Sequence, residues 1–248
     1  DPGNAEDLFV NLFIANDGRT EWNHISNHKI NRKLSMVLLS HLENGSQLND
    51  RNFDGFLDTP LKKDIILRNE WHYRGDRGVV GEYSITGLRK NSMAGQKSTF
   101  DPDLTDPFTL FDNLLESDTS SNWSAATKIE RVEASAKTGY IFPNKEWQSI
   151  GSQLFGSYHQ HNHRFGIRDY SGTEKFFRGN LLFSSIFGDM DHKYTTGVSF
   201  VYNDFYEIGN WSEPINNLPP GGIAWHDTLT RTEIVPGAFF EYTWTVSE

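Results

Sequence analysis

The sequence predicts an all-β fold, an antiparallel transmembrane β-barrel built from long strands. Three observations predict it: apolar and polar residues alternate with a period of two, several alternating segments are long, and the connections between them alternate between short and long. Strands of ordinary globular sheets average ~5–6 residues, whereas a strand that crosses a membrane needs ~9–11. The sequence has no apolar run of ~18 or more residues, so it contains no candidate transmembrane helix.

The alternation divides the chain into about ten strands. Around residues 194–204, for example, Val198 and Phe200 share one face while Ser199 lies on the other. Most segments have an apolar or aromatic face and a face of small or polar residues. The strands are expected at 8–16, 20–29, 34–44, 61–74, 78–91, 127–141, 148–163, 173–187, 193–207 and 230–246.

The connections differ at the two ends of the expected strands. Short polar turns are expected at Ile30–Lys33, Gly75–Gly78, Phe142–Trp147 and Gly188–Lys193, and a tight Asn-Asp-Gly turn at Asn16–Gly18 joins the first pair. Long loops are expected around Asp50, at 91–127, at "HNHRFGIRDYSGTEK" (161–175) and at "GNWSEPINNLPPGGIAWHD" (209–227). Short turns at one end and long loops at the other are typical of outer-membrane barrels.

The two strand faces suit lipid on the outside of a barrel and a hydrated lumen inside. We expect lipid contact at Phe177, Leu181, Phe183, Val198, Phe200, Phe240 and Tyr242. The alternative is a secreted β-sandwich with long loops at one end, which would act as a carbohydrate-binding or hydrolytic domain. No catalytic motif of the G-x-S-x-G, H-E-x-x-H or phosphate-cradling type is present, and we predict no enzymatic activity.

The composition limits the partners and the chemistry of the chain. Its 248 residues carry a formal net charge of -10, which argues against nucleic acid as a partner. It has no cysteine, so disulfides and thiolate metal sites are excluded. Aromatic residues make up 14% of a chain that is only 36% hydrophobic, and they gather near expected strand ends, as interfacial girdles do.

Three segments resemble those of a known family. They are "LNDRNFDGFLDTPLKKDIILRNEWHYRG" (48–75), "AKTGYIFPNKEWQSIGSQLFGSYHQH" (136–161) and "RTEIVPGAFFEYTW" (231–244). They resemble, in consistent order, barrel segments of TonB-dependent outer-membrane receptors, especially the cobalamin-receptor-like group of Bacteroidetes. The likeness is specific for the family but not for its ligand.

The resemblance implies a barrel of about 22 strands that an N-terminal plug closes from inside. It implies active uptake, across the bacterial outer membrane, of a scarce metal chelate such as cobalamin, haem or a siderophore. The implied partners are outer-membrane lipid, the TonB complex, the small-molecule ligand and a surface lipoprotein. The sequence shows no TonB box and no plug, so we expect residues 1–248 to be an interior piece of such a barrel.

A candidate calcium site lies in the loop around Gly55. Asp50, Asn52, Asp54 and Asp58 offer oxygen ligands in a pattern similar to an EF-hand loop, but Leu61 stands where the closing acid belongs. In cobalamin receptors an Asp-rich extracellular loop at a similar place binds calcium, so the resemblance implies calcium here. We expect the acidic stretch 101–118 to be an acidic surface loop; a role in sharing that cation or in gating the ligand is the alternative. For residues 50–58 the alternative to a calcium site is a self-capped turn.

Three alternating histidines are candidate ligand-binding residues. His159, His161 and His163 share one strand face, and extrapolation from Gln153 and Ser157 places that face in the lumen. Neutral imidazoles bind transition metals and haem iron. The alternative is a polar lining of the lumen or of a loop. We add Trp211 and Trp225, in the last long connection, as further ligand-binding candidates.

Overall fold

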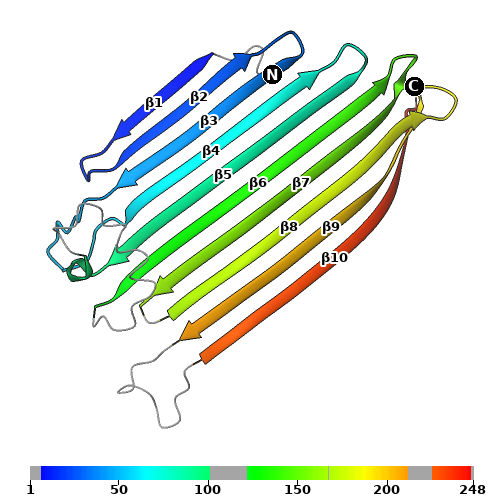
Figure 1. Cartoon of the computed structure of the whole chain (residues 1–248). Helices are drawn as coiled ribbons and strands as arrows, with labels where there is room; N and C mark the ends of the chain where they lie inside the picture. The colour runs from blue at the N-terminus through cyan, green and yellow to red at the C-terminus, as the bar shows by residue number, and fades with distance from the viewer. Residues whose placement is uncertain (1–6, 101–121, 167, 212–224, 247–248) are drawn as a thin grey trace.

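The structure is a computed structural model, and it describes residues 7–100, 122–166, 168–211 and 225–246 (Figure 1). These residues form one 10-stranded antiparallel sheet whose strands follow each other in chain order. The strands are β1 (Leu8–Ile14), β2 (Thr20–Lys29), β3 (Leu34–Gly45), β4 (Leu61–Arg74), β5 (Val79–Gly95), β6 (Ser124–Phe142), β7 (Lys145–Phe165), β8 (Arg168–Ile186), β9 (His192–Trp211) and β10 (Trp225–Trp244). A short 3₁₀ helix, η2 (Lys97–Thr99), follows β5.

The all-β class and the order of the strands are confirmed. Within the described residues there is no second sheet, which the alternative of a β-sandwich requires. β1 pairs only with β2 and β10 only with β9, so these two strands are the edges of an open sheet. The described residues contain no helix that is long and apolar enough to cross a membrane.

The strands after β4 extend further than the sequence suggested. The expected loop at 161–175 is wrong, because β7 continues to Phe165 and β8 begins at Arg168. The alternation persists through this stretch, and Gly166 turns the chain with φ 61° while its N–H donates to the Ser124 carbonyl at 2.7 Å. The loops expected at 91–127 and 209–227 are likewise shortened by strand residues at both ends.

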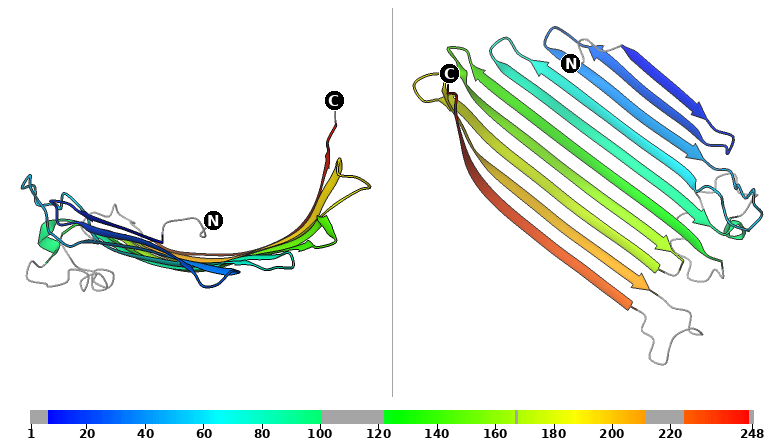
Figure 2. Two further views of the ribbon diagram at one scale, coloured as in Figure 1. Left: turned by 90° about the horizontal axis from the view of Figure 1, so that it is seen from above. Right: turned by 180° about the vertical axis from the view of Figure 1, so that it is seen from behind.

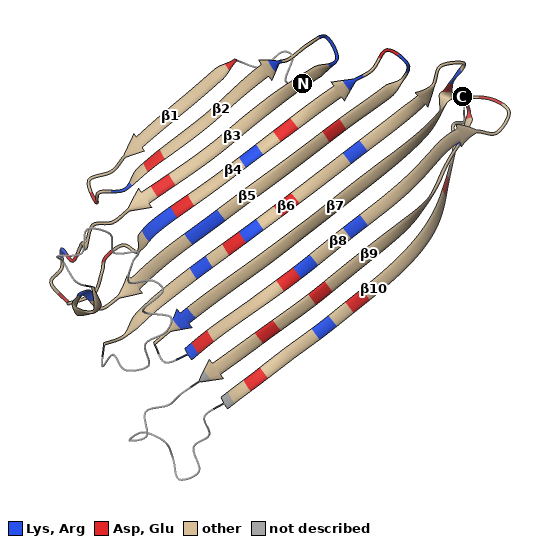
Figure 3. Ribbon diagram, in the orientation of Figure 1, with Lys and Arg blue, Asp and Glu red and all other residues tan. Residues whose placement is uncertain are grey.

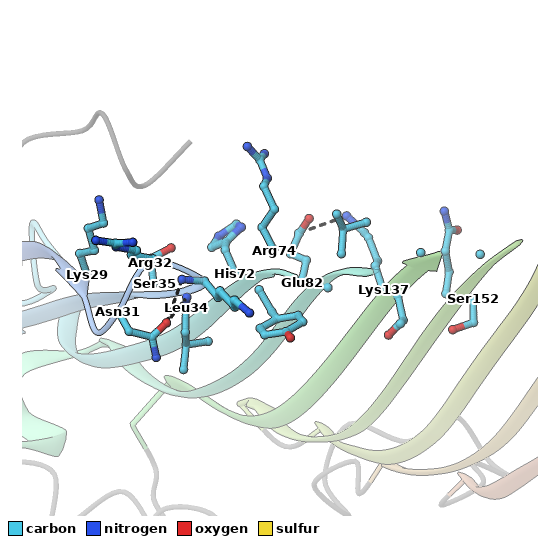
Figure 4. Close-up of a pocket in the computed structure, with 18 of the residues that line it drawn as sticks. Lys29, Asn31, Arg32, Leu34, Ser35, His72, Arg74, Glu82, Lys137 and Ser152 are labelled. Atoms are coloured by element: carbon cyan, nitrogen blue, oxygen red, sulfur yellow. Dashed lines mark hydrogen bonds and ion pairs between the residues drawn. The ribbon is translucent and has the colours of Figure 1, made fainter. Parts of the chain in front are cut away.

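The sheet is a single curved layer with a concave and a convex face (Figure 2). The register fixes which residues share a face, because directly paired residues of antiparallel strands point to the same side. One such row crosses eight strands and consists of Leu34, Tyr73, Gly81, Thr138, Ser152, Leu181, Val198 and Ala238. Arg74, Glu82 and Lys137, which stand one position away from this row on their strands, rise from the concave side of the sheet (Figure 4), so the row lies on the convex face.

The convex face carries a band of apolar side chains. On β9, for example, the band runs from Tyr194 to Tyr202, and the Phe200 ring lies 6.3 Å from that of Phe177 on β8. Side chains of the band remain largely uncovered, with Val198 54% exposed and Phe240 61% exposed. Among the described residues, the buried apolar cluster consists only of Leu61, Met93, Phe100 and Ala126, at the base of the long loops. The sheet therefore does not bury its own apolar face.

The band ends in charges on the side of the long loops. The ion pair Arg89–Glu130 joins β5 and β6 at 3.5 Å, and Lys175–Asp204 joins β8 and β9 at 3.7 Å, both on the convex face. Figure 3 shows the charged residues of β8 and β9 mainly in the half nearest the long loops. The other half of these strands is almost free of charge.

Candidate functional site

The concave face is polar where the convex face is apolar. Glu70 Oε2 accepts hydrogen bonds from Arg68 Nη2 at 2.7 Å and from Arg68 Nε at 3.0 Å, and its other oxygen lies 2.7 Å from His72 Nε2. Arg131 and Glu133 approach to 3.0 Å on β6. These partners stand two residues apart on one strand, so they share a face and pair along it. Such a surface is suited to water and polar solutes.

A hollow of about 780 Å³ lies on this face close to the short turns (Figure 4). Its charged lining is mainly basic, with Lys29, Arg32, Lys33, Arg74 and Lys137 against one carboxylate, that of Glu82. The Lys137 ammonium lies 3.2 Å from the Glu82 carboxylate. In the adjoining turn, Lys33 donates a hydrogen bond to the Asp76 carboxylate. This bond and the negative charge of Asp76 both raise the pKa of Lys33. The hollow can therefore hold an anionic group of a ligand or of a neighbouring protein segment.

Sequence reasoning missed this hollow. Its lining comes from β2 to β8, and its shape depends on the curvature of the sheet. One signal was present: Arg74 and Glu82 flank the turn at Gly75–Gly78 on the polar side of their strands. Alternation within single strands reveals a polar face, but it does not show which residues of distant strands meet.

The second feature of the concave face is the histidine row, His159, His161 and His163 on β7. All three lie on the side of Gln153, as predicted. The ring centroids of His159 and His161 are 5.4 Å apart, and those of His161 and His163 are 5.1 Å apart. His159 Nε2 lies 3.4 Å from His161 Nδ1.

Neighbouring strands hold the histidine row in place. The His161 ring stacks on Tyr170 of β8 with centroids 5.1 Å apart and planes at 20°. Across from it, Gly172 leaves room for the imidazole, because a Cβ at this position would lie 2.7 Å from His161 Nε2. His163 Nδ1 lies 3.2 Å from the Thr127 hydroxyl of β6. The three rings are thus half-buried between side chains of β6 and β8.

The histidine row lies level with the convex-face charge Lys175 or beyond it, outside the apolar band. Burial lowers the pKa of His159, His161 and His163, and the neighbouring imidazoles lower the pKa of His159 and His163 further. A lowered pKa favours the uncharged ring, which is the form in which imidazole nitrogens bind metals.

The two candidate tryptophans lie at the same end of the sheet. Trp211 ends β9, Trp225 begins β10, and the register pairs them directly. Trp211 also pairs with Arg168, which pairs with Phe165, two residues beyond His163. The structure thus brings both tryptophan positions to the edge next to the histidine row. Their role in binding stays a prediction.

The loop around Gly55 is a network of side-chain caps. The Phe56 N–H donates to Asp54 Oδ1 at 2.8 Å, and the Arg51 N–H donates to Asp58 Oδ2 at 2.7 Å. The Asn52 amide donates to Asp54 Oδ2 at 2.9 Å. The chain turns sharply at Phe53, with φ 60°, and at Gly55, with φ 85°. These bonds match the self-capped turn that was the alternative to a calcium site.

The fit of the loop to calcium is incomplete. In the described part of the chain, no three His, Cys, Asp or Glu side chains are grouped so that they could hold a metal ion. Asp50 Oδ1 is buried and has no hydrogen-bond partner among the described residues, so one oxygen is free for a cation. Asn52, Asp54 and Asp58 would have to exchange their present partners. The acidic stretch 101–118 lies outside the described residues, and calcium binding stays a prediction.

No protein-family model, no curated protein and no solved structure matches this chain. Function is therefore inferred from the fold, the basic hollow and the histidine row.

Proposed function

We propose that this chain is part of the wall of a TonB-dependent receptor in the bacterial outer membrane. The receptor takes up a scarce nutrient, such as cobalamin, haem or a siderophore complex, and it obtains energy through the TonB complex. The observation that carries this proposal is the division of one curved sheet into an uncovered apolar convex face and an ion-paired concave face. A membrane barrel needs this distribution, since lipid covers its outside and water fills its lumen.

The height of the apolar band supports the proposal. On β9 the band extends from Tyr194 to Tyr202. Nine residues at ~3.3 Å each, on a strand tilted by ~40°, span ~23 Å along the membrane normal. Outer-membrane barrels carry an apolar band of ~25 Å.

The position of the band along successive strands supports a tilted arrangement. Leu42 and Ile65, on β3 and β4, belong to the band, but their row continues into Arg89 on β5 and Glu130 on β6. The band therefore shifts towards the short turns as the sheet proceeds from β3 to β10. Strands that cross a membrane at an angle place their apolar residues in this staggered way.

The open edges support the view that this sheet is part of a larger one. Unpaired backbone groups of β1 and β10 could not face lipid, because nothing in the bilayer core can bond to them. We propose that further strands, from the same polypeptide or from another chain, continue the sheet at both edges. The concave face, with its basic hollow and histidine row, then lines the lumen through which the nutrient passes.

Uptake by bacteria that lack the gene tests the proposed function. We expect the deletion strain to lose growth on one limiting nutrient out of cobalamin, haem and a panel of ferric siderophores. The gene should restore growth only when the TonB complex is intact. Unchanged growth on the whole panel, together with recovery of the protein from the soluble secreted fraction, would refute the proposal.

A further inference from the structure

The spacing of two nitrogens in the histidine row carries an inference beyond transport. His159 Nε2 and His161 Nδ1 lie 3.4 Å apart. Two imidazole nitrogens that each bind a tetrahedral Zn²⁺ at ~2.0–2.1 Å are ~3.3–3.4 Å from each other. The pair therefore already has the separation that two ligands of one zinc ion require.

The surrounding side chains hold this pair without competing for it. Tyr170 supports one face of the His161 ring, and Gly172 leaves the space that the ring edge occupies. The Nδ1 atom of His159 and the Nε2 atom of His161, which point away from the shared gap, have no hydrogen-bond partner among the described residues. Each ring can therefore adopt the tautomer that carries its proton on the outer nitrogen. The two facing nitrogens are then free to act as ligands.

Two glutamates of the neighbouring strands belong to the surroundings of this histidine pair. Glu174 of β8 is the register partner of His159. The Glu207 side chain of β9 borders the same space above Gly172 as the His161 ring. A metal-bound histidine commonly donates its second ring N–H to a carboxylate, which fixes the tautomer. Glu174 and Glu207 are the candidates for that role.

We propose that His159 Nε2 and His161 Nδ1 bind one borderline transition-metal cation, with Zn²⁺ as the best fit to their separation. The described residues supply no third side chain that completes a metal-binding group, so the other ligands are water or donor atoms of a bound molecule. Zn²⁺, Cu²⁺ and Ni²⁺ all favour imidazole, whereas Ca²⁺ and Mg²⁺ favour oxygen. His163 stays outside the site because its Nδ1 faces Thr127.

Metal titration of the purified protein in detergent tests this site. Zn²⁺ affinity is measured calorimetrically, and Co²⁺ is used as a spectroscopic probe because tetrahedral Co²⁺ absorbs strongly in the visible. We expect His159→Ala and His161→Ala each to weaken Zn²⁺ binding at least tenfold and to abolish the tetrahedral Co²⁺ spectrum. The matched control is His163→Ala, on the same strand and face, which should bind within about twofold of the wild type.

A fourth variant keeps both ligands and disturbs only their spacing. Gly172→Ala places a methyl group against the His161 ring, so it should also weaken Zn²⁺ binding. Circular dichroism and the melting temperature show whether each variant has folded. Equal Zn²⁺ affinity in wild type and His159→Ala, or equal losses in His163→Ala and His159→Ala, would overturn the proposal. Zn²⁺ binding is measured separately from nutrient uptake. A negative binding result would therefore refute the metal site without refuting the proposed receptor function, and a negative uptake result would leave the metal site untouched.

Discussion

At the scale of single residues, Val198 and Ser199 are neighbours in the sequence that lie on opposite faces of β9. Val198 lies at the centre of the band on β9, between Leu181 and Ala238 in the register, and is 54% exposed. Ser199 points to the concave face, level with Asn180. The sequence predicted this alternation correctly, because period-two patterning is a property of a single strand.

The two positions should respond very differently to a charge. If Val198 sits near the membrane midplane, Val198→Arg should lower the free energy of unfolding by ~2–4 kcal/mol. Ser199→Arg, which differs by one position, should cost much less because its guanidinium would reach the lumen of the proposed barrel. Urea unfolding of both variants in lipid vesicles measures the difference. Similar losses for the two variants would contradict the assignment of the faces.

Asp54 is the residue on which the loop around Gly55 depends. Asp54→Ala removes acceptors for the Phe56 N–H and the Asn52 amide, so trypsin should cut the loop at Arg51 faster even without calcium. Asp54→Asn keeps one acceptor oxygen and should be cut at an intermediate rate.

Added calcium then separates the two hypotheses for this loop. If the loop binds calcium, calcium should slow cleavage of the wild type but not of Asp54→Asn, which lacks the charge. If calcium changes neither rate, the loop is a self-capped turn. The sequence alone could not decide this, because alternating Asp and Asn side chains serve a cation and backbone caps equally well.

At the scale of elements, the connection between β7 and β8 shows where sequence reasoning failed. Residues 161–175 are rich in His, Asn, Asp, Gly and Ser, which favour a loop by composition. Yet His161, His163 and Phe165 continue one alternation, and Tyr170 and Gly172 pair with it from β8. Tertiary pairing therefore overrode the local composition. The histidine row was predicted as a shared face, but its stacking on Tyr170 depends on this pairing.

The turn at Gly166 should be sensitive to a side chain. Gly166→Ala combines the strain of a positive φ with a contact of 3.0 Å to the Trp123 ring. We expect it to lower the free energy of unfolding by more than the ~1–2 kcal/mol of the backbone term alone. The matched control is Gly188→Ala, since Gly188 has φ 80° and open space around it. Equal melting temperatures of wild type and Gly166→Ala would contradict the observed turn.

At the scale of the whole molecule, the described residues form one open, curved sheet. Its strand order and its two faces could be predicted from the sequence, because each strand carries its own alternation and each short turn imposes an antiparallel neighbour. The basic hollow could not, since it depends on curvature and on the register of β2 to β8. The stagger of the apolar band also emerged only from the register, which aligns Ile65 with Arg89.

Lipid accessibility along β9, in outer membranes of bacteria that express the protein, tests most directly the proposal that this sheet is part of a membrane barrel. The chain has no cysteine, so single cysteines can be introduced one at a time and labelled with a fluorophore. Nitroxide-bearing phospholipids should quench the label at the convex positions Thr196, Val198, Phe200 and Tyr202. They should leave it bright at the concave positions Gly197, Ser199 and Val201. A uniform response along the strand, with neither set quenched or both quenched alike, would show that this sheet does not separate lipid from water.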